Sequence, residues 1–284
     1  MSYKVTHQNH LSIRKTADYS VKIGRCNRMP MDFKSEALRA ARLIAQENDN
    51  IWISYSGGID SEFIICVFLE AGIDFKVATV AMKNKINEYD LQHSRSFCHR
   101  AGIKLHEFEI DVEEFYRNEL ETYAVATNCI SPQFPVHMWL WDQLDGLIVA
   151  GHGDPIFKCK DREWYLQIQE KEDSVFRYAK WRDRNMAPGF YVYTPELLLS
   201  FMLEQEVSNM FLAPKRAGLK DIQQVKHLVY SKYYDINARE KQTGFEYIQD
   251  LDTKYRTDLK NKISGHGVFL QPVRELLDRL WPNL

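Results

Sequence analysis

Apolar and polar positions along the first 150 residues alternate between short β-prone runs and longer stretches with helical spacing. The short runs predict strands at 51–55, 75–82, 104–110 and 146–150. The longer stretches predict helices at 32–47, 62–70, 88–100, 112–126 and 134–144, and Asp32 is the expected N-cap of the helix at 32–47. Strands and helices in this alternating order are typical of a mostly parallel sheet with helices on both faces.

The last third of the chain has helical patterns and no clear strand beyond about residue 160. The sequence Thr194-Pro195-Glu196 begins one helix, because threonine caps well and proline suits the first turn. Residues 221–234 form a second helical stretch. We therefore predict an α/β fold in three parts: an N-terminal extension with a helix at 1–50, an α/β core at 51–160, and a helical C-terminal part at 161–284.

Composition and charge restrict the class of protein. Hydrophobic residues make up 45% of the chain and charged residues 27%, a balance that supports a sizeable buried core. The net charge of −2 provides no general basic field, so nucleic acid is not the expected partner. The five cysteines form no C-x-x-C pair, and neither a membrane-spanning run nor a signal peptide is recognisable. We expect a cytoplasmic protein without membrane association.

The hexapeptide from Ser56 to Ser61 lies between the first predicted strand and a buried helix. Gly57 and Gly58 allow the backbone N–H groups to approach an anion, and the helix N-terminus adds positive potential. The hydroxyls of Ser56 and Ser61 can donate to phosphate oxygens. A phosphate would repel Asp60 unless a Mg²⁺ ion lies between them. A tight turn with a serine cap would also explain the glycines, but the position after a strand favours a nucleotide and metal site.

Ser-Gly-Gly-Ile-Asp-Ser resembles the S-G-G-x-D-S loop of the PP-loop ATP pyrophosphatases. The resemblance implies a HUP-like core (adenine nucleotide alpha hydrolase-like) that binds ATP and Mg²⁺. Members of this superfamily cleave ATP between the α- and β-phosphates and adenylate an oxygen of their substrate. The loop has no lysine after its glycines, which distinguishes it from the Walker pattern.

Two further segments are similar to the synthetase domain of asparagine synthetases and β-lactam synthetases. After the fourth strand, Gly151-His152-Gly153-Asp154 takes the place of an acidic motif of that family. The resemblance implies that Gly151 contacts the nucleotide and that Asp154 joins Asp60 as a metal ligand. His152 replaces a glutamate of the family; it is either an acid/base, since imidazole titrates near neutrality, or a loop histidine bonded to backbone.

The segment 237–246 resembles an R-x-K-x-G-F type stretch of asparagine synthetases. The resemblance implies that Lys241, or else Arg239, contacts the phosphates, where a cation stabilises charge that develops on departing pyrophosphate. A solvent-exposed charged face would also account for Arg-Glu-Lys.

Together these features predict an ATP-dependent ligase that forms AMP and pyrophosphate. It would adenylate a carboxylate or carbonyl oxygen of a small acid or amide for attack by a nitrogen nucleophile. We expect no glutaminase domain, so the nitrogen would come from ammonia, a separate amidotransferase subunit or an amine in the substrate. Two alternatives remain open: a tRNA or nucleotide thiolation enzyme using Cys98 and Cys159, and a non-catalytic nucleotide-binding scaffold.

Overall fold

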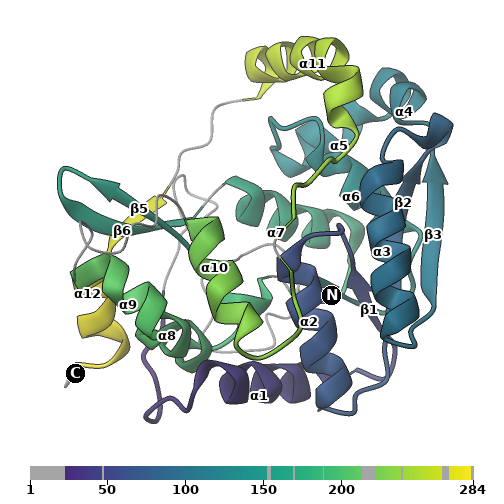
Figure 1. Cartoon of the computed structure of the whole chain (residues 1–284). Helices are drawn as coiled ribbons and strands as arrows, with labels where there is room; N and C mark the ends of the chain where they lie inside the picture. The colour runs from purple at the N-terminus through teal and green to yellow at the C-terminus, as the bar shows by residue number, and fades with distance from the viewer. Residues whose placement is uncertain are drawn as a thin grey trace.

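The main sheet of the molecule has five parallel strands. The computed structural model describes residues 23–46, 48–151, 155–168, 170–187, 189–212, 222–237, 239–263 and 269–282. The strand order is β3-β2-β1-β4-β7, and every neighbouring pair runs parallel. Figure 1 shows β3, β2 and β1 on the right-hand side of the molecule. The strands are β1 (Ile51–Ser54), β2 (Lys76–Met82), β3 (Leu105–Ile110), β4 (Leu147–Ala150) and β7 (Met186–Ala187). The four strands predicted from the sequence therefore share one sheet, and the predicted parallel α/β fold is confirmed.

Helices cover both faces of this sheet because successive residues of each strand point to opposite sides. Ile51 and Ile53 of β1 enter one core, while Trp52 enters the other. The first core is closed by α1 (Phe33–Gln46), α2 (Ile59–Glu70), α3 (Glu88–Arg100), α8 (Pro195–Leu203), α9 (Gln205–Leu212), α10 (Ile222–Ser231) and α12 (Val273–Leu280). The second is closed by α4 (Val112–Asn118), α5 (Leu120–Thr127), α6 (Phe134–Asp142), α7 (Glu170–Arg182) and α11 (Gln249–Lys262).

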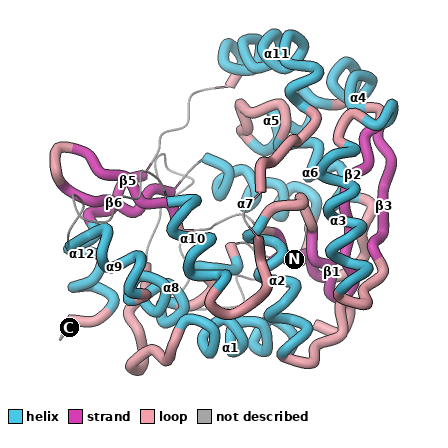
Figure 2. Tube along the Cα trace, viewed as in Figure 1, coloured by secondary structure: helices cyan, strands magenta, loops and turns pink. Residues whose placement is uncertain are grey.

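The C-terminal part is mainly helical, but it also contains strands that the sequence patterns did not predict. A separate antiparallel sheet has the order β5-β6-β8, formed by β5 (Ile156–Lys160), β6 (Glu163–Ile168) and β8 (Phe269–Pro272). This sheet lies at the opposite end of the molecule from β3 (Figure 2). β7 joins the main sheet with only two residues, too few to produce a recognisable pattern. The predicted boundaries of the three parts stay a prediction.

Local capping signals in the sequence agree with the helices that form. The Asp32 carboxylate accepts a hydrogen bond from the backbone N–H of Ser35 at 2.9 Å, so it caps the start of α1. Thr194 accepts from the N–H of Leu197 at 3.1 Å and caps α8. The single helix expected at 112–126 is divided into α4 and α5 at Glu119, whose backbone is not helical. Within the described ranges, we find no helix of the length and apolarity that a membrane span requires.

Candidate functional site

The predicted loop lies at the carboxyl end of β1, where it turns into α2. Gly57 has a φ of +70°, and a Cβ at this position would lie 3.1 Å from Ser94 Oγ and 3.2 Å from an Arg239 nitrogen. Glycine is therefore required there for both conformation and space. Gly58 is the N-cap of α2 and has no side chain to cap the first turn. The N–H groups of that turn thus face the end of the sheet, as an anion site needs.

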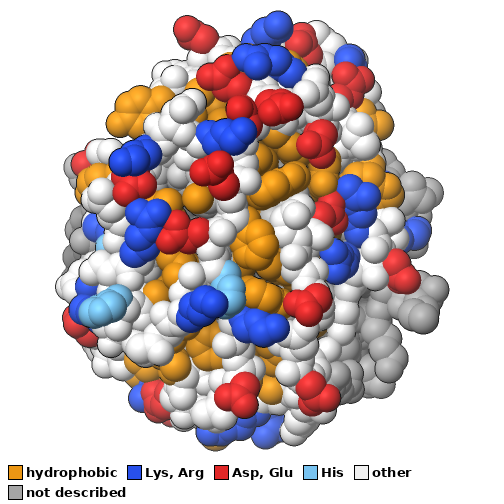
Figure 3. All heavy atoms as spheres, turned by 90° about the vertical axis from the view of Figure 1, so that its right-hand side faces the viewer, with side chains coloured by type: hydrophobic (Ala, Val, Ile, Leu, Met, Phe, Trp, Pro, Cys, Tyr) orange, Lys and Arg blue, Asp and Glu red, His pale blue; other side chains and the backbone are white. Residues whose placement is uncertain are grey.

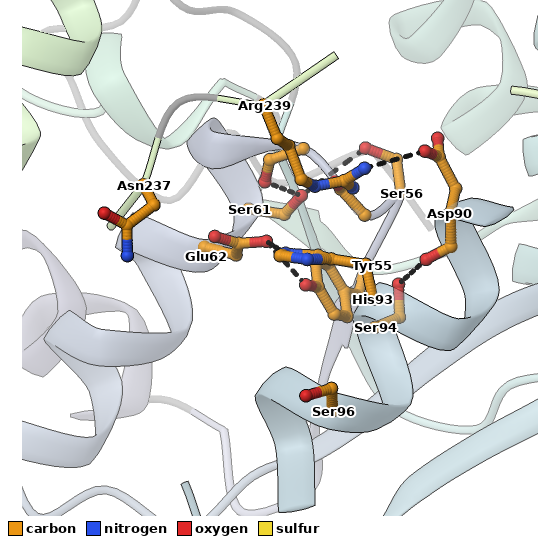
Figure 4. Close-up of polar contacts among 12 residues, drawn as sticks. Tyr55, Ser56, Ser61, Glu62, Asp90, His93, Ser94, Ser96, Asn237 and Arg239 are labelled. Carbon is orange, nitrogen blue, oxygen red and sulfur yellow. Dashed lines mark hydrogen bonds and ion pairs between the residues drawn. The ribbon is translucent and has the colours of Figure 1, made fainter. Parts of the chain in front are cut away.

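The two serines of the loop lie close together on the same side of the turn. Ser56 Oγ and Ser61 Oγ are 3.4 Å apart, and Ser61 also donates to the carbonyl of Gly58 at 3.1 Å (Figure 4). Gly151, which follows β4, lies directly against the loop, since a Cβ added to it would be 3.2 Å from Ser61 Cβ. The predicted residues Ser56, Ser61 and Gly151 are therefore brought together. His152 and Asp154 lie outside the described residues, so their predicted roles stay predictions.

Arg239 connects the C-terminal segment to the loop. Its guanidinium donates to the carboxylate of Asp90 on α3 at 2.9 Å and to the carbonyl of Gly57. Figure 4 shows the side chain reaching across the loop toward Asp90. The alternative of a solvent-exposed charged face does not hold for Arg239, because its side chain is only 16% exposed. In this arrangement Arg239 holds the loop, and its predicted contact with phosphate stays a prediction.

Lys241 lies close to the second glycine of the same turn. A Cβ added to Gly58 would be 3.5 Å from Lys241 Nζ, so the ammonium faces the N-terminus of α2. Lys241 is an exposed residue that lines a cavity. Desolvation by the neighbouring protein lowers the pKa of Lys241, while the negative charges of Asp90 and Asp60 act in the opposite direction. An anion bound at the loop would therefore lie close to this ammonium.

A cavity of about 220 Å³ adjoins the loop. The ends of β1 and β2, the start of α6 and the segment after Lys241 form its wall, with lining residues that include Ser56, Thr79, Met82, Phe134 and Phe245. Lys171 and Lys241 both line it, and Lys171 contributes to lowering the pKa of Lys241. The lining is thus partly apolar and partly cationic. The volume is below the roughly 300 Å³ of common small-molecule pockets, so a ligand the size of a nucleotide would extend from it across the loop.

Asp60, the expected metal ligand, has a cation of the protein beside it. Lys226 Nζ lies 3.0 Å from Oδ1 and 3.0 Å from Oδ2 of Asp60, and the Tyr230 hydroxyl donates to Oδ1 at 3.0 Å. Among the residues that the structure describes, no three His, Cys, Asp or Glu side chains are grouped to hold a metal ion. Within the described part of the chain, an ammonium and a hydroxyl therefore lie against the Asp60 carboxylate. The predicted magnesium pair of Asp60 and Asp154 is untested, since Asp154 is not described.

A buried carboxylate lies directly below the loop. Glu62, whose side chain is 3% exposed, accepts a hydrogen bond from the Tyr55 hydroxyl at 2.7 Å and lies 2.7 Å from His93 Nε2 (Figure 4). Burial and the charge of Glu62 raise the pKa of Tyr55, so the phenol stays protonated and donates. This trio ties the end of β1 and the start of α2 to α3. It thereby supports the loop from beneath.

Several residues of the site were not found from the sequence. Lys226 and Tyr230 contact the loop from far along the chain, Asp90 binds Arg239, and Glu62 was assigned only to the helix. One signal was present: Lys226 and Tyr230 are four residues apart in a predicted helix, so both side chains lie on one face.

The two cysteines and the surface charge bear on the alternative of a tRNA thiolation enzyme. Burial raises the pKa of the Cys98 thiol to about 12, which leaves little reactive thiolate at neutral pH. Cys159 is exposed on β5. On the face drawn in Figure 3, which includes the side of α3 and β3, acidic and basic side chains are interspersed. That face has no continuous basic surface for a phosphate backbone.

Comparisons with known proteins give only distant similarities. No family profile matches the chain, and no curated protein matches it. Among solved structures, it resembles a glutamine-dependent NAD+ synthetase from Acinetobacter baumannii in complex with ADP (TM-score 0.34, 13% identity). The match covers 88% of this chain and 48% of that chain, so the chain spans about half of that synthetase.

Two further solved structures are similar at the same level. An NH3-dependent NAD synthetase from Campylobacter jejuni, in complex with nitrate, matches with a TM-score of 0.34, 13% identity, and coverage of 82% and 93%. An NMN synthetase from Francisella tularensis matches with a TM-score of 0.34, 12% identity, and coverage of 83% and 96%. At such identities, function has to be inferred from the residues of the site itself.

Proposed function

We propose that this chain is an ATP-dependent ligase of the PP-loop type, which forms AMP and pyrophosphate. The observation that carries the proposal is the position of Lys241 Nζ opposite Gly58, at the uncapped N-terminus of α2. Backbone N–H groups, a helix dipole and an ammonium converge there on one point. This combination binds the phosphates of a nucleotide.

The adjoining cavity could bind the base of the nucleotide. Its wall at Val80, Phe134 and Phe245 is apolar enough to bind a flat base, while Ser56 stands at the boundary with the loop. A nucleotide with its base in the cavity would place its phosphates over Gly57 and Gly58. Because no lysine follows these glycines, the loop is not built like the γ-phosphate cradle of Walker proteins.

The proposed reaction has two steps. First, a carboxylate or carbonyl oxygen of the acceptor attacks the α-phosphorus of ATP, the bond to the bridging oxygen breaks, and pyrophosphate leaves. Lys241 stabilises the negative charge that grows on that leaving group. Next, a nitrogen nucleophile attacks the activated carbon and AMP departs with the former substrate oxygen. The protein mainly positions the reacting groups and neutralises their charge.

The resemblance of 237–246 to asparagine synthetases supports an acid or amide as acceptor, because both Arg239 and Lys241 of that segment meet the loop. Ammonia, a separate amidotransferase subunit or an amine of the substrate would supply the nitrogen.

Exchange of labelled pyrophosphate into ATP tests the proposal, with small carboxylic acids and amides screened one at a time. We expect exchange with at least one acceptor. Exchange should be lost in Lys241→Ala, while the unfolding curve of this variant matches that of the wild type and shows that it is folded. Formation of ADP and orthophosphate would contradict the proposal. Nucleotide binding without exchange under any acceptor would favour a scaffold. Activity only with tRNA, lost in Cys98→Ser or Cys159→Ser, would favour thiolation.

A further inference from the structure

Lys226 is a fully buried ammonium that is aimed at the loop. Its side chain is 0% exposed, and Nζ is 3.0 Å from each carboxylate oxygen of Asp60. Tyr230, one helical turn further along α10, donates to Oδ1 of the same carboxylate. Both oxygens of the loop's acid are therefore engaged by side chains from a single helix.

The contacts around this pair hold it in place. The ring of Tyr230 stacks on Phe63 of α2 with centroids 4.6 Å apart, which fixes α10 against the helix that begins at the loop. The Tyr191 hydroxyl donates to the backbone carbonyl of Asp60 at 2.6 Å. A buried lysine requires a close negative partner, because desolvation of an unpaired charge is costly. Asp60 provides that partner.

We infer that Lys226 is the built-in counter-cation of the loop and that it excludes a divalent cation from Asp60 in the nucleotide-free chain. The ammonium lies between the two oxygens, where a metal bound by both would lie, and it would repel a second cation at that distance. A metal that serves this site would arrive bound to the phosphates of a ligand.

This inference concerns the chain without nucleotide, so it does not depend on the reaction proposed above. Titration of the full-length protein with Mn²⁺, followed by electron paramagnetic resonance in the absence of nucleotide, tests it. We expect Asp60→Asn to leave the wild-type isotherm unchanged, because Asp60 binds no metal. We expect Lys226→Met to gain affinity for one Mn²⁺ ion by at least tenfold. The double variant Lys226→Met/Asp60→Asn should lose that gain.

The inference would be overturned if folded Lys226→Met bound Mn²⁺ no more tightly than the wild type. It would also be overturned if the wild type had a Mn²⁺ site that Asp60→Asn lost. A measurement on the wild type alone covers the case in which the variants fail to fold. In the nucleotide-free protein, Mn²⁺ should leave the amide NMR signals of Asp60 and Tyr230 sharp. Selective broadening of these signals at low Mn²⁺ would show a metal at Asp60 and refute the role of Lys226.

Discussion

The guanidinium of Arg239 and the carboxylate of Asp90 form an ion pair at 2.9 Å across 149 residues of sequence. The same oxygen of Asp90 accepts the backbone N–H of Gln242 at 3.1 Å. Its second oxygen, Oδ2, is buried and has no hydrogen-bond partner among the residues that the structure describes. Because Arg239 also donates to the carbonyl of Gly57, this pair connects the C-terminal segment, α3 and the loop. It holds Lys241 over the turn.

Replacement of Arg239 by alanine should therefore weaken both the fold and ligand binding. Removal of one partner from a largely buried ion pair leaves the other charge uncompensated, and we expect the free energy of unfolding to fall by about 3 kcal/mol. Denaturant unfolding measures this loss. Arg239→Lys is the matched control, because it keeps the charge but cannot contact Asp90 and Gly57 with one planar group. Its free energy of unfolding should lie between those of the wild type and Arg239→Ala. Wild-type stability in Arg239→Ala would contradict the assignment.

The hydrogen bonds to Glu62 predict a second set of stability changes. Tyr55→Phe removes one donor and should lower the free energy of unfolding by about 1 kcal/mol. Glu62→Leu leaves the Tyr55 hydroxyl and His93 without their shared acceptor, so its cost should be larger, about 2–3 kcal/mol. In the double variant Tyr55→Phe/Glu62→Leu, the two losses should not add, because both remove the same contact. Additive losses in thermal or denaturant unfolding would argue against the contact.

The sequence allowed prediction of the parts of the site that depend on local structure. The order of strand, loop and helix around Ser56 follows from hydrophobic runs and two glycines within 20 residues. Arg239 and Lys241 were found by resemblance alone, since nothing local in Arg-Glu-Lys distinguishes a loop contact from a solvated surface.

The residues that contact the loop through tertiary packing could not be predicted from local sequence patterns. Lys226 and Tyr230 reach Asp60 only because α10 packs on α2; their spacing places both on one helix face but does not indicate what that face contacts. The small sheet was missed for a related reason: β5 exposes Lys158, Cys159 and Lys160, so it lacks the alternation of a half-buried strand. The C-terminal part therefore appeared purely helical in the sequence, although it is only mainly so.

The two loop glycines should respond differently to alanine. At Gly57, alanine would adopt a positive φ and place Cβ 3.1 Å from Ser94 Oγ, so Gly57→Ala should lower the free energy of unfolding by roughly 1–2 kcal/mol. At Gly58, φ is −102° and the added Cβ would make ordinary contacts at 3.5 Å with Lys241 Nζ and Ser56 Oγ.

Gly58→Ala should therefore keep the wild-type unfolding curve and still lose affinity for nucleotide, because its methyl group occupies the space between the turn and the ammonium. Calorimetric titration with ATP measures the affinity, and circular dichroism measures the unfolding. Equal ATP affinity in Gly58→Ala and the wild type would place the anion elsewhere.

The lowered pKa of Lys241 predicts a pH dependence of stability. Desolvation holds the folded-state pKa below the ordinary value of 10.5, so between these two values the unfolded chain binds more protons at this residue than the folded chain does. The contribution of Lys241 to the free energy of unfolding must then rise with pH through that window. We expect the difference between wild type and Lys241→Met to shift in favour of the wild type as pH increases from 7 toward 10.5. Parallel denaturant unfolding of both proteins across this range measures the shift, since other titrating groups cancel in the difference. A difference that stays constant, or that moves in favour of Lys241→Met, would mean that the folded protein does not lower the pKa of Lys241.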